Sequence, residues 1–491
     1  MPFTCLSGWR AEMKEYGKPI SCYIKTVSPL HLGCDEVYEP LNFVVDEEHC
    51  RLMVFELGVF WHHLSAPERQ RFTALCQKGT ISSILEIYKF MRGRQMSGKA
   101  VKVCPGLVEH YRQTLSLPLG NEKKIKQELN NFTIARTAFL PHDGRPYIPG
   151  SAIKGALRTA YLNHLATKTS LPRQNSSRNL EQALLDGGSF ATDPFRFATD
   201  PFRMLKVSDF LPVGEVLTRV IYAVNEKKKL SPFSARGPYQ ILEVIEPGSI
   251  FVGTITIDWP ERQAGIRTPI ERPVLFHSAA WFYGQQKVRE DEELRDIGTK
   301  PISVPKVNSD FLLRLGRHSG AESVTIAGHR QIRIMQGRGK PAKFENHSTT
   351  LWLASDDPKK YVKENLTPFG WALMAELGEP EARAYEEQEA AWRQHQEQQI
   401  TQARAAEAHK PKPVAVAPIK TDPVDKLKEE LKLIKPDDAG RLGTIIQKIE
   451  TLETPQQKAA LARAIKEHLE PKRFKKHKRR DYLLKLIESD S

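Results

Sequence analysis

The stretch from residue 144 to residue 160 constrains the fold of this chain more than any other segment. Up to residue 150 it carries residues that interrupt helices and strands. These are Gly144, Pro146, Pro149 and Gly150. Apolar residues then recur at the helical period from Ile153 to Leu165, and Ser151 stands where a helix N-cap is expected. The stretch therefore predicts a loop that leads into an amphipathic helix.

The first turns of that helix combine features that suit an anion. Lys154 and Arg158 are four residues apart and therefore share one face. Unpaired backbone N–H groups and the positive end of the helix dipole lie at the same end, an arrangement that binds phosphate. Gly155 would let another backbone approach closely. An ordinary capped helix with two solvated cations explains the same residues, and the residues alone slightly favour that interpretation.

A resemblance shifts the balance. Residues 148–158 read IPGSAIKGALR. This segment resembles the I-P-G-S-S-[IL]-K-G-x-[IL]-R signature of the RAMP superfamily of CRISPR proteins, with Ala152 as the departure. In that superfamily the signature opens a helix next to bound RNA. The resemblance therefore implies an RNA-binding role for five residues: Gly150, Ser151, Lys154, Gly155 and Arg158.

Composition agrees with a nucleic-acid partner. The chain has 491 residues, 27% of them charged, and a net charge of +14, which favours a polyanion. A basic protein without such a partner remains the alternative. No lipidation motif, signal segment or apolar run of ~18 residues is present, so a cytoplasmic protein with no membrane partner is expected. The six cysteines form no Cys-x-x-Cys pair, which predicts reduced, mostly buried thiols and no metal or cofactor.

Periodicity along the body predicts an α+β fold. Strands are expected at 20–26, 51–55, 131–139, 220–224 and 241–257, and helices over 65–128 and 275–288. The resemblance implies that these elements build two ferredoxin-like RAMP units, residues 1–215 and 216–378, followed by a helical C-terminal extension. Between the first strand and the next lies a turn with His31. That histidine could be a general base, an RNA contact or a turn residue, and the lack of a visible partner favours the structural role.

A second phosphate-binding loop is predicted after residue 311. Gly316, Ser319 and Gly320 would let backbone N–H groups face a phosphate, and arginines flank them. The segment LRLGRHSGAESV resembles the glycine-rich loop of the second RAMP unit, which implies RNA contacts. A further basic turn covers residues 336–341, and a plain turn with solvated arginines is the alternative for both segments. The residues expected to bind RNA here are Arg314, Gly316, Arg317, His318, Arg338 and Lys340.

A tandem copy interrupts the region between the helix and the strands that follow. Residues 190–196 and 197–203 both read FATDPFR. The copy is too short for a solenoid, which indicates a local duplication in a surface loop. The second copy continues into MLKVSD, which resembles a "DPFRxLKVSD" strand of the family, so the second copy is expected to take the packed position.

The composition changes after residue 378. Residues 379–420 predict an exposed charged helix and a Pro-rich linker, and residues 421–491 a small basic helical module. Seven of the nine residues from 472 to 480 are Lys or Arg. This run could contact RNA or be a solvated tail, and the sequence leaves both open. No family resemblance covers this extension.

Within the superfamily, the body resembles the fifth Csm subunits of type III-A effector complexes. That resemblance implies a structural protein that caps the 3′ part of CRISPR RNA (crRNA), supports crRNA maturation, and has crRNA, target RNA and other Csm RAMP subunits as partners. No catalytic constellation emerges. The alternative function is a repeat-processing RAMP endoribonuclease with His31, His142 or His318 as general base. Asp35 is the nearest positional analogue of the aspartate with which the backbone RAMP subunit cleaves target RNA. A weaker third possibility is a protein-only adaptor.

Overall fold

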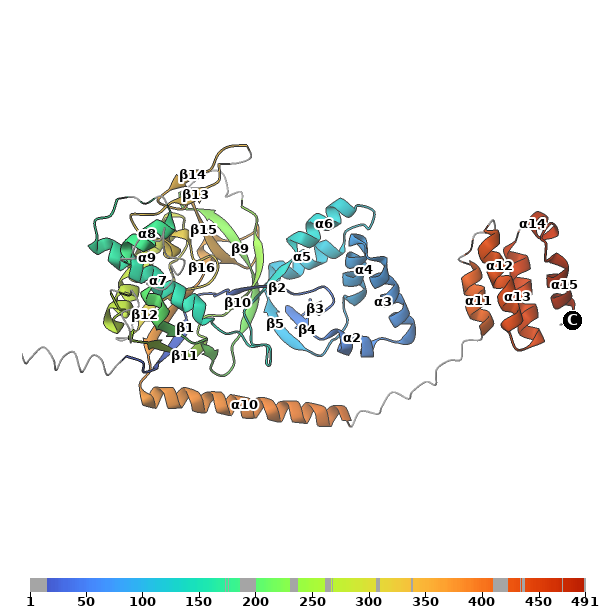
Figure 1. Ribbon diagram of the computed structural model, residues 1–491, viewed down its shortest axis with the longest axis horizontal. Helices are drawn as coiled ribbons and strands as arrows, with labels where there is room; N and C mark the ends of the chain where they lie inside the picture. The colour runs from blue at the N-terminus through green and yellow to red at the C-terminus, as the bar shows by residue number, and fades with distance from the viewer. Residues whose placement is uncertain are drawn as a thin grey trace, which may run out of the picture. The chain divides into compact units, whose positions relative to one another are not determined.

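The structure is a computed structural model of the 491-residue chain (Figure 1). It divides into two compact units, Met1–Gln398 and Gln399–Ser491. The residues it describes are 16–172, 174, 176–185, 200–229, 237–260, 266, 268–305, 310–336, 339–408, 423–432, 434, 438–469 and 471–489.

The first unit contains a sheet, here called sheet one, that has the ferredoxin-like strand order. Its main path is β12-β17-β1-β11-β7, every neighbouring pair is antiparallel, and β8 also pairs with β11. The chain order β1–α7–β7–β11–α9–β17 is a βαββαβ unit with β12 added at the edge. The elements are β1 (Ile20–Thr26), α7 (Gly150–Lys168), β7 (Leu205–Val207), β8 (Leu211–Pro212), β11 (Ile250–Ile257), α9 (Arg272–Asp296), β12 (Phe311–Arg314) and β17 (Trp371–Glu376).

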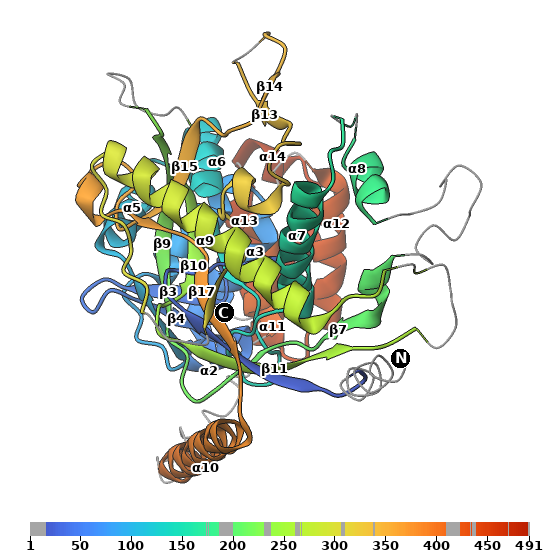
Figure 2. The same cartoon turned by 90° about the vertical axis from the view of Figure 1, so that its left-hand side faces the viewer.

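Helices α7 and α9 pack side by side on one face of sheet one (Figure 2). Alternate residues of β1 face them, since Cys22 and Ile24 are fully buried in the same core as the apolar stripe of α7. The Tyr283 hydroxyl of α9 donates a hydrogen bond of 3.2 Å to the Ala156 carbonyl of α7. The predicted helix face is confirmed, because Ile153, Ala156, Leu157 and Ala160 are all buried.

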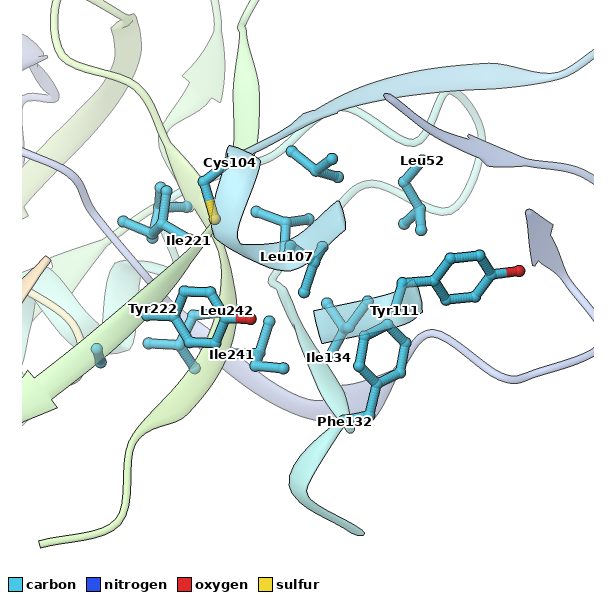
Figure 3. Close-up of a cluster of buried hydrophobic side chains, with 14 of the residues drawn as sticks. Leu52, Cys104, Leu107, Tyr111, Phe132, Ile134, Ile221, Tyr222, Ile241 and Leu242 are labelled. Carbon is cyan, nitrogen blue, oxygen red and sulfur yellow. The ribbon is translucent and has the colours of Figure 1, made fainter. Parts of the chain in front are cut away.

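A second, nine-stranded sheet, sheet two, has the main path β2-β6-β10-β9-β5-β4-β3, with β15 on β9 and β16 on β15. The five central residues of β9, Val220 to Val224, are all buried, as expected for a strand covered on both faces. Figure 3 shows part of its core, where Tyr111 and Phe132 lie with ring centroids 5.8 Å apart. The strands are β2 (Gly33–Val37), β3 (Phe43–Asp46), β4 (Arg51–Val54), β5 (Lys99–Val103), β6 (Ile134–Thr137), β9 (Thr218–Lys227), β10 (Gln240–Ile245), β15 (Thr350–Ser355) and β16 (Thr367–Pro368).

The predicted helical region 65–128 is helical except for one strand. Strand β5, with the sequence KAVKV, pairs with β4 and β9 and was missed, because five residues with two apolar positions give a weak period. The helices around it are α2 (Leu57–His63), α3 (Ala66–Lys78), α4 (Ile81–Met91), α5 (Pro105–Leu115) and α6 (Glu122–Asn131). The remaining short elements of this unit are α8 (Ser177–Leu184), η1 (Pro201–Met204), η2 (Ala321–Val324), β13 (Ile332–Ile334), β14 (Lys343–Glu345) and η3 (Lys363–Asn365).

Helix α10 (Glu379–Ala408) is exposed along most of its described length, as predicted, and its first half is also attached to the body. The guanidinium of Arg145 donates to both carboxylate oxygens of Glu389, at 2.9 and 2.8 Å, and lies 3.7 Å from the ring centroid of Trp392. The Arg145 side chain is only 7% exposed. The sequence did not predict this attachment, because the arginine that makes the contact lies 244 positions away in the chain.

The second unit is helical, which confirms the predicted helical C-terminal extension, and it has its own core. Fourteen buried residues between Val424 and Leu483 form one apolar cluster. The elements are α11 (Pro423–Lys432), α12 (Ala439–Lys448), η4 (Ile449–Thr451), α13 (Pro455–His468), α14 (Pro471–Lys475) and α15 (Arg480–Glu488).

The α+β class with a helical extension is confirmed, and the two sheets are assembled from distant segments. Sheet one joins β1 to β17, and sheet two joins β2 to β15 through β6, β10 and β9, so each sheet takes strands from both sides of residue 215. The division of the body at that residue therefore stays a prediction. Among the described cysteines only Cys22 and Cys104 are fully buried, fewer than expected, and the five described thiols are free. No helix in the described part of the chain is long and apolar enough to cross a membrane.

Candidate nucleic-acid interface

Helix α7 begins two residues earlier than predicted. Its N-cap is Pro149, which has no side-chain donor or acceptor, so the assignment of Ser151 as N-cap was wrong. The Gly150 amide donates to the Asp209 carboxylate at 2.8 Å. A Cβ on Gly150 would lie 2.4 Å from the Val207 carbonyl oxygen, so Gly150 is the glycine that allows a close approach of two backbones.

Gly155 has a different environment from the one predicted. A Cβ on Gly155 would meet no protein atom within 4 Å, so no other part of the described chain approaches it closely. Gly155 and Ser151 are both exposed, and they lie four residues apart on one edge of α7. This edge is open to a ligand.

The two cations of the signature are bonded to protein groups. The Lys154 ammonium donates to the Leu205 carbonyl at 2.7 Å, and burial lowers its pKa. Arg158 pairs with Glu181 at 2.6 Å and with Asp200 at 2.9 Å. Both side chains therefore hold α7 to the segment that leads into β7. Lys154 and Arg158 as direct phosphate ligands stay predictions.

The second FATDPFR copy supplies part of that segment. Phe202 is buried and packs against Tyr161, with ring centroids 5.5 Å apart, and the Arg158 guanidinium lies 4.9 Å from the Phe202 ring. The described part of the second copy, residues 200–203, takes the packed position that was predicted. The first copy, 190–196, lies outside the described residues.

The predicted glycine-rich loop is a tight turn that fits against the turn containing His31. Gly316, His318 and Gly320 all have positive φ, at 75°, 62° and 79°. The Arg317 amide donates to the His31 carbonyl at 2.9 Å. A Cβ on Gly316 would lie 2.3 Å from the same carbonyl oxygen, so the left-handed conformation and the close contact both require glycine here.

Arg314 was predicted to bind RNA, and the structure contradicts this. Its side chain is 2% exposed and forms an ion pair with Glu290, which is equally buried. Its Nε donates to the Phe369 carbonyl at 3.1 Å, and its guanidinium lies 4.8 Å from the Trp371 ring. A guanidinium enclosed in this way cannot contact a phosphate, so Arg314 has a structural role.

The histidines at this turn are also poorly placed for catalysis. His31 is fully buried, with Nδ1 2.7 Å from the Glu243 carbonyl, so the expectation that it contacts RNA is wrong. Burial lowers the pKa of His31 and lowers that of His318 to about 4. The ring of His318 is half-buried against Trp352, with centroids 4.5 Å apart. His142 is exposed and lies 3.4 Å from Asp143.

Few of the residues predicted to act around the turn at 316–320 are exposed. Arg317 is exposed, and its side chain lies against Gly33, where an added Cβ would be 3.5 Å from Arg317 Cδ. Asp35, two residues after Gly33, is also exposed. It has a positive φ of 59° and lies where the pairing of β2 with β6 changes register. Lys340 is exposed, and Arg338 lies outside the described residues. The described residues contain no group of three or more His, Cys, Asp or Glu side chains that could hold a metal ion.

The predicted residues therefore form two groups. One is the outer edge of α7, and the other is the turn at 316–318 on the turn at 31–33. The segment from Ala138 to Gly150 connects them, since the Ala138 amide donates to the Leu32 carbonyl and the chain then enters α7. Sequence reasoning missed Arg145, although it lies within the signature stretch, because its role depends on Glu389.

The sequence of this region matches a known family. The model of the RAMP superfamily matches residues 23–300, more than half of the chain. The protein therefore belongs to the RAMP superfamily.

Individual relatives are more distant. A protein described as "CRISPR system Cms protein Csm5", from Enterococcus italicus, is 21% identical over 317 residues, which cover 62% of this chain and 78% of the relative. A chain in a cryo-EM structure of a Csm–crRNA–target RNA ternary complex of a type III-A CRISPR–Cas system is 18% identical with a TM-score of 0.46, covering 73% of this chain and all of the other. Crystalline Csm5 from T. onnurineus is 17% identical with a TM-score of 0.39, over 72% of this chain and 99% of the other.

Proposed function

We propose that the protein is an RNA-binding structural subunit of a type III-A CRISPR effector complex. Its partners would be crRNA, target RNA and other Csm RAMP subunits, and its place would be at the 3′ part of the crRNA. The observation that carries the proposal is the open edge of α7. The signature that resembles RNA-contacting segments forms a helix start. Its Ser151 and Gly155 are exposed, and no described residue outside α7 comes within 4 Å of a Cβ placed on Gly155.

In this proposal RNA lies along the Gly155 edge. The sugar–phosphate backbone can come close to α7 there because no side chain projects from Gly155. Lys154 and Arg158 hold α7 in place, while Arg317 provides an exposed guanidinium at the second turn. Contacts of this kind are independent of base identity, as a subunit that receives guides of many sequences requires.

The test is a pair of matched substitutions in helical glycines. Gly155→Glu places a carboxylate at the proposed RNA edge, whereas Gly284→Glu places one on α9, where a Cβ also meets no protein atom within 4 Å. A carboxylate about 4 Å from a phosphate costs about 1 kcal/mol at the dielectric of water and about 4 kcal/mol at an effective dielectric of 20, which is roughly a fivefold to nearly thousandfold loss of affinity. We expect this loss for a labelled single-stranded guide RNA with Gly155→Glu and little change with Gly284→Glu.

Equal affinities of the two variants would refute the location of the site. Purification of the protein from its host followed by sequencing of bound RNA tests the larger proposal. Guide-length RNA of many sequences is the expected result. RNA absent from the purified complex would contradict the proposed function.

We further infer that the subunit binds RNA without cutting it. His31 is enclosed, and His318 has a pKa of about 4 and stacks on Trp352, so neither is poised to take a proton near neutral pH. Labelled repeat RNA should remain intact with wild type, with or without divalent metal. Cleavage that disappears in His142→Ala, the exposed histidine of the three, would establish the endoribonuclease alternative.

A further inference from the structure

The C-terminal module presents an ordered basic surface. The run from residue 472 to residue 480 begins in α14 and ends at the start of α15. Phe474 is 7% exposed and belongs to the core of the module, so it anchors the run. Backbone hydrogen bonds from Lys476 to Arg473 and from His477 to Phe474 fix the turn that follows. The run is therefore part of a folded surface, which decides against a solvated tail.

Its charge is hardly compensated. All seven Lys and Arg side chains of the run belong to exposed residues, the set being Lys472, Arg473, Lys475, Lys476, Lys478, Arg479 and Arg480. Among the described residues, the ion pair of this run is the 3.8 Å contact of Arg480 with Asp481. Residues 421–491 hold 17 Lys or Arg and 13 Asp or Glu, so without the run the module would have a net charge of −3. The positive charge of the module is thus gathered in one place.

The arrangement costs stability within the module. Arg479 and Arg480 stand at the N-terminal end of α15, where the helix dipole disfavours cations, and five further cations lie within eight residues of them. An anionic partner would relieve this repulsion. The family match ends at residue 300, so it assigns no role to this surface.

We propose that the C-terminal module is a separate RNA-binding element whose basic run contacts the sugar–phosphate backbone. Lysine ammonium groups bind phosphates as point charges without reading bases. Phe474 is buried and Tyr482 is half-buried, with Arg479 5.9 Å from its ring, so the run presents no free aromatic platform for base stacking. Binding should therefore be independent of sequence. Membrane insertion is disfavoured because the apolar residues of α14 and α15 face the core.

The anion-binding surface stands on the module alone, whereas the choice of RNA over DNA rests on the function proposed for the body. The module can be tested by itself because its core consists of its own residues, 424–483. We would measure binding of the fragment 421–491 to a fluorescein-labelled, unstructured single-stranded RNA by anisotropy across a salt series. Its test variant carries Lys472→Ala, Lys475→Ala and Lys476→Ala.

The control variant carries Lys458→Ala, Lys466→Ala and Lys485→Ala, which remove the same charge from the same module outside the run. Three phosphate contacts contribute a slope of about −2 to log K against log salt and about 100-fold in affinity at 0.1 M salt. We expect the test variant to lose both and the control to keep most of its affinity. Circular dichroism would verify that each variant remains helical.

Several outcomes would overturn the proposal. Equal losses in the two variants would show that only net charge matters. An unchanged salt slope in the test variant would remove the run from the interface. Tighter binding to phosphatidylserine vesicles or to an acidic peptide would assign the surface to a membrane or a protein, and tighter binding to single-stranded DNA would refute RNA as its ligand. If the fragment binds RNA while Gly155→Glu leaves the RNA affinity of the full chain unchanged, the proposed site on α7 is wrong and the proposed site on the C-terminal module stands.

Discussion

Arg314 and Arg317 are close neighbours in the sequence, and both were predicted to bind RNA. The structure gives them different environments, one buried and one exposed. Arg314 is paired with Glu290 inside the body, and Arg317 is exposed. Replacing each with alanine should therefore separate stability from RNA affinity. Arg314→Ala should destabilise the protein, and Arg317→Ala should weaken RNA binding.

The magnitude for Arg314 follows from its enclosure. Glu290 also accepts a hydrogen bond of 2.5 Å from the Trp371 indole, and its side chain is 2% exposed, so Arg314→Ala leaves a carboxylate buried without its charge partner. Breaking such a pair from one side costs roughly 3–5 kcal/mol. In a body of this size, Met1–Gln398, that loss corresponds to a fall in Tm of roughly 3–7 °C.

Replacing both partners tests the cause. Arg314→Met combined with Glu290→Met removes the buried charges together, and buried pairs replaced by apolar groups often lose little stability or even gain some. The double variant should therefore recover most of the Tm lost by Arg314→Ala. A double variant as unstable as the single one would show that the loss comes from packing against Trp371 and not from the unpaired charge.

For Arg317→Ala, calorimetry should show a change within about 0.5 kcal/mol, as for other exposed substitutions. Anisotropy with single-stranded RNA should show a slope of log K against log salt that is shallower by about 0.7, the contribution of one phosphate contact. An Arg314→Ala protein with wild-type Tm and lost RNA affinity would refute the assignment of roles.

Three other expectations concern the same body. Because the folded-state pKa values of His31 and His318 are lowered, the unfolded chain takes up protons first, and stability should fall as the pH drops from about 6.5 towards 4. For His318, whose pKa is about 4, the loss of stability between pH 7 and pH 5 is roughly 2 kcal/mol. This contribution of His318 should be absent from pH-dependent urea unfolding of the His318→Gln variant. Deleting residues 190–196 should change Tm little, since shortening a loop by a few residues alters closure entropy by about 1 kcal/mol or less; a large fall would mean that the first copy is packed. Lys154→Ala should flatten the salt dependence of RNA binding by about 0.7 if its ammonium leaves the Leu205 carbonyl for a phosphate, and an unchanged slope in filter binding would leave it a structural residue.

Local patterns predicted the local structure well. The stripe from Ile153 to Ala160 predicted α7, and alternation predicted β1, because each depends on neighbours within a few residues. The predicted helix start was two residues late because Pro149 takes the N-cap without a side-chain hydrogen bond, whereas the prediction relied on the hydroxyl of Ser151.

Polar partners far apart in the chain could not be predicted in this way. Arg314 reaches a carbonyl 55 residues away, and nothing in its own segment distinguishes it from exposed Arg317. The same holds for the topology of sheet one, where β1 pairs with β17 near the other end of the body. This long-range pairing decides which arginine is buried. Arg314 lies in β12, which pairs with β17.

The position of α10 affects where RNA could bind on this fold. In β1, Cys22 and Ile24 face α7 and α9, so Tyr23 faces the opposite side of sheet one, beside its partner Val252. Tyr385 of α10 lies on that side, with its ring centroid 6.3 Å from that of Tyr23, and the Tyr23 hydroxyl donates to Asp310.

Ferredoxin-like RNA-binding domains commonly stack bases on this open sheet face. Here α10 lies over part of the corresponding face, with Glu386 and Glu389 beside Val252 in the cavity between helix and sheet. The covering helix leaves bases no access to the sheet at that place, where Glu389 is neutralised by Arg145 and Arg393. We therefore infer that RNA contacts fall on the helix-bearing side and on the turns, where Gly155 and Arg317 are exposed, and that the sheet face serves to attach α10.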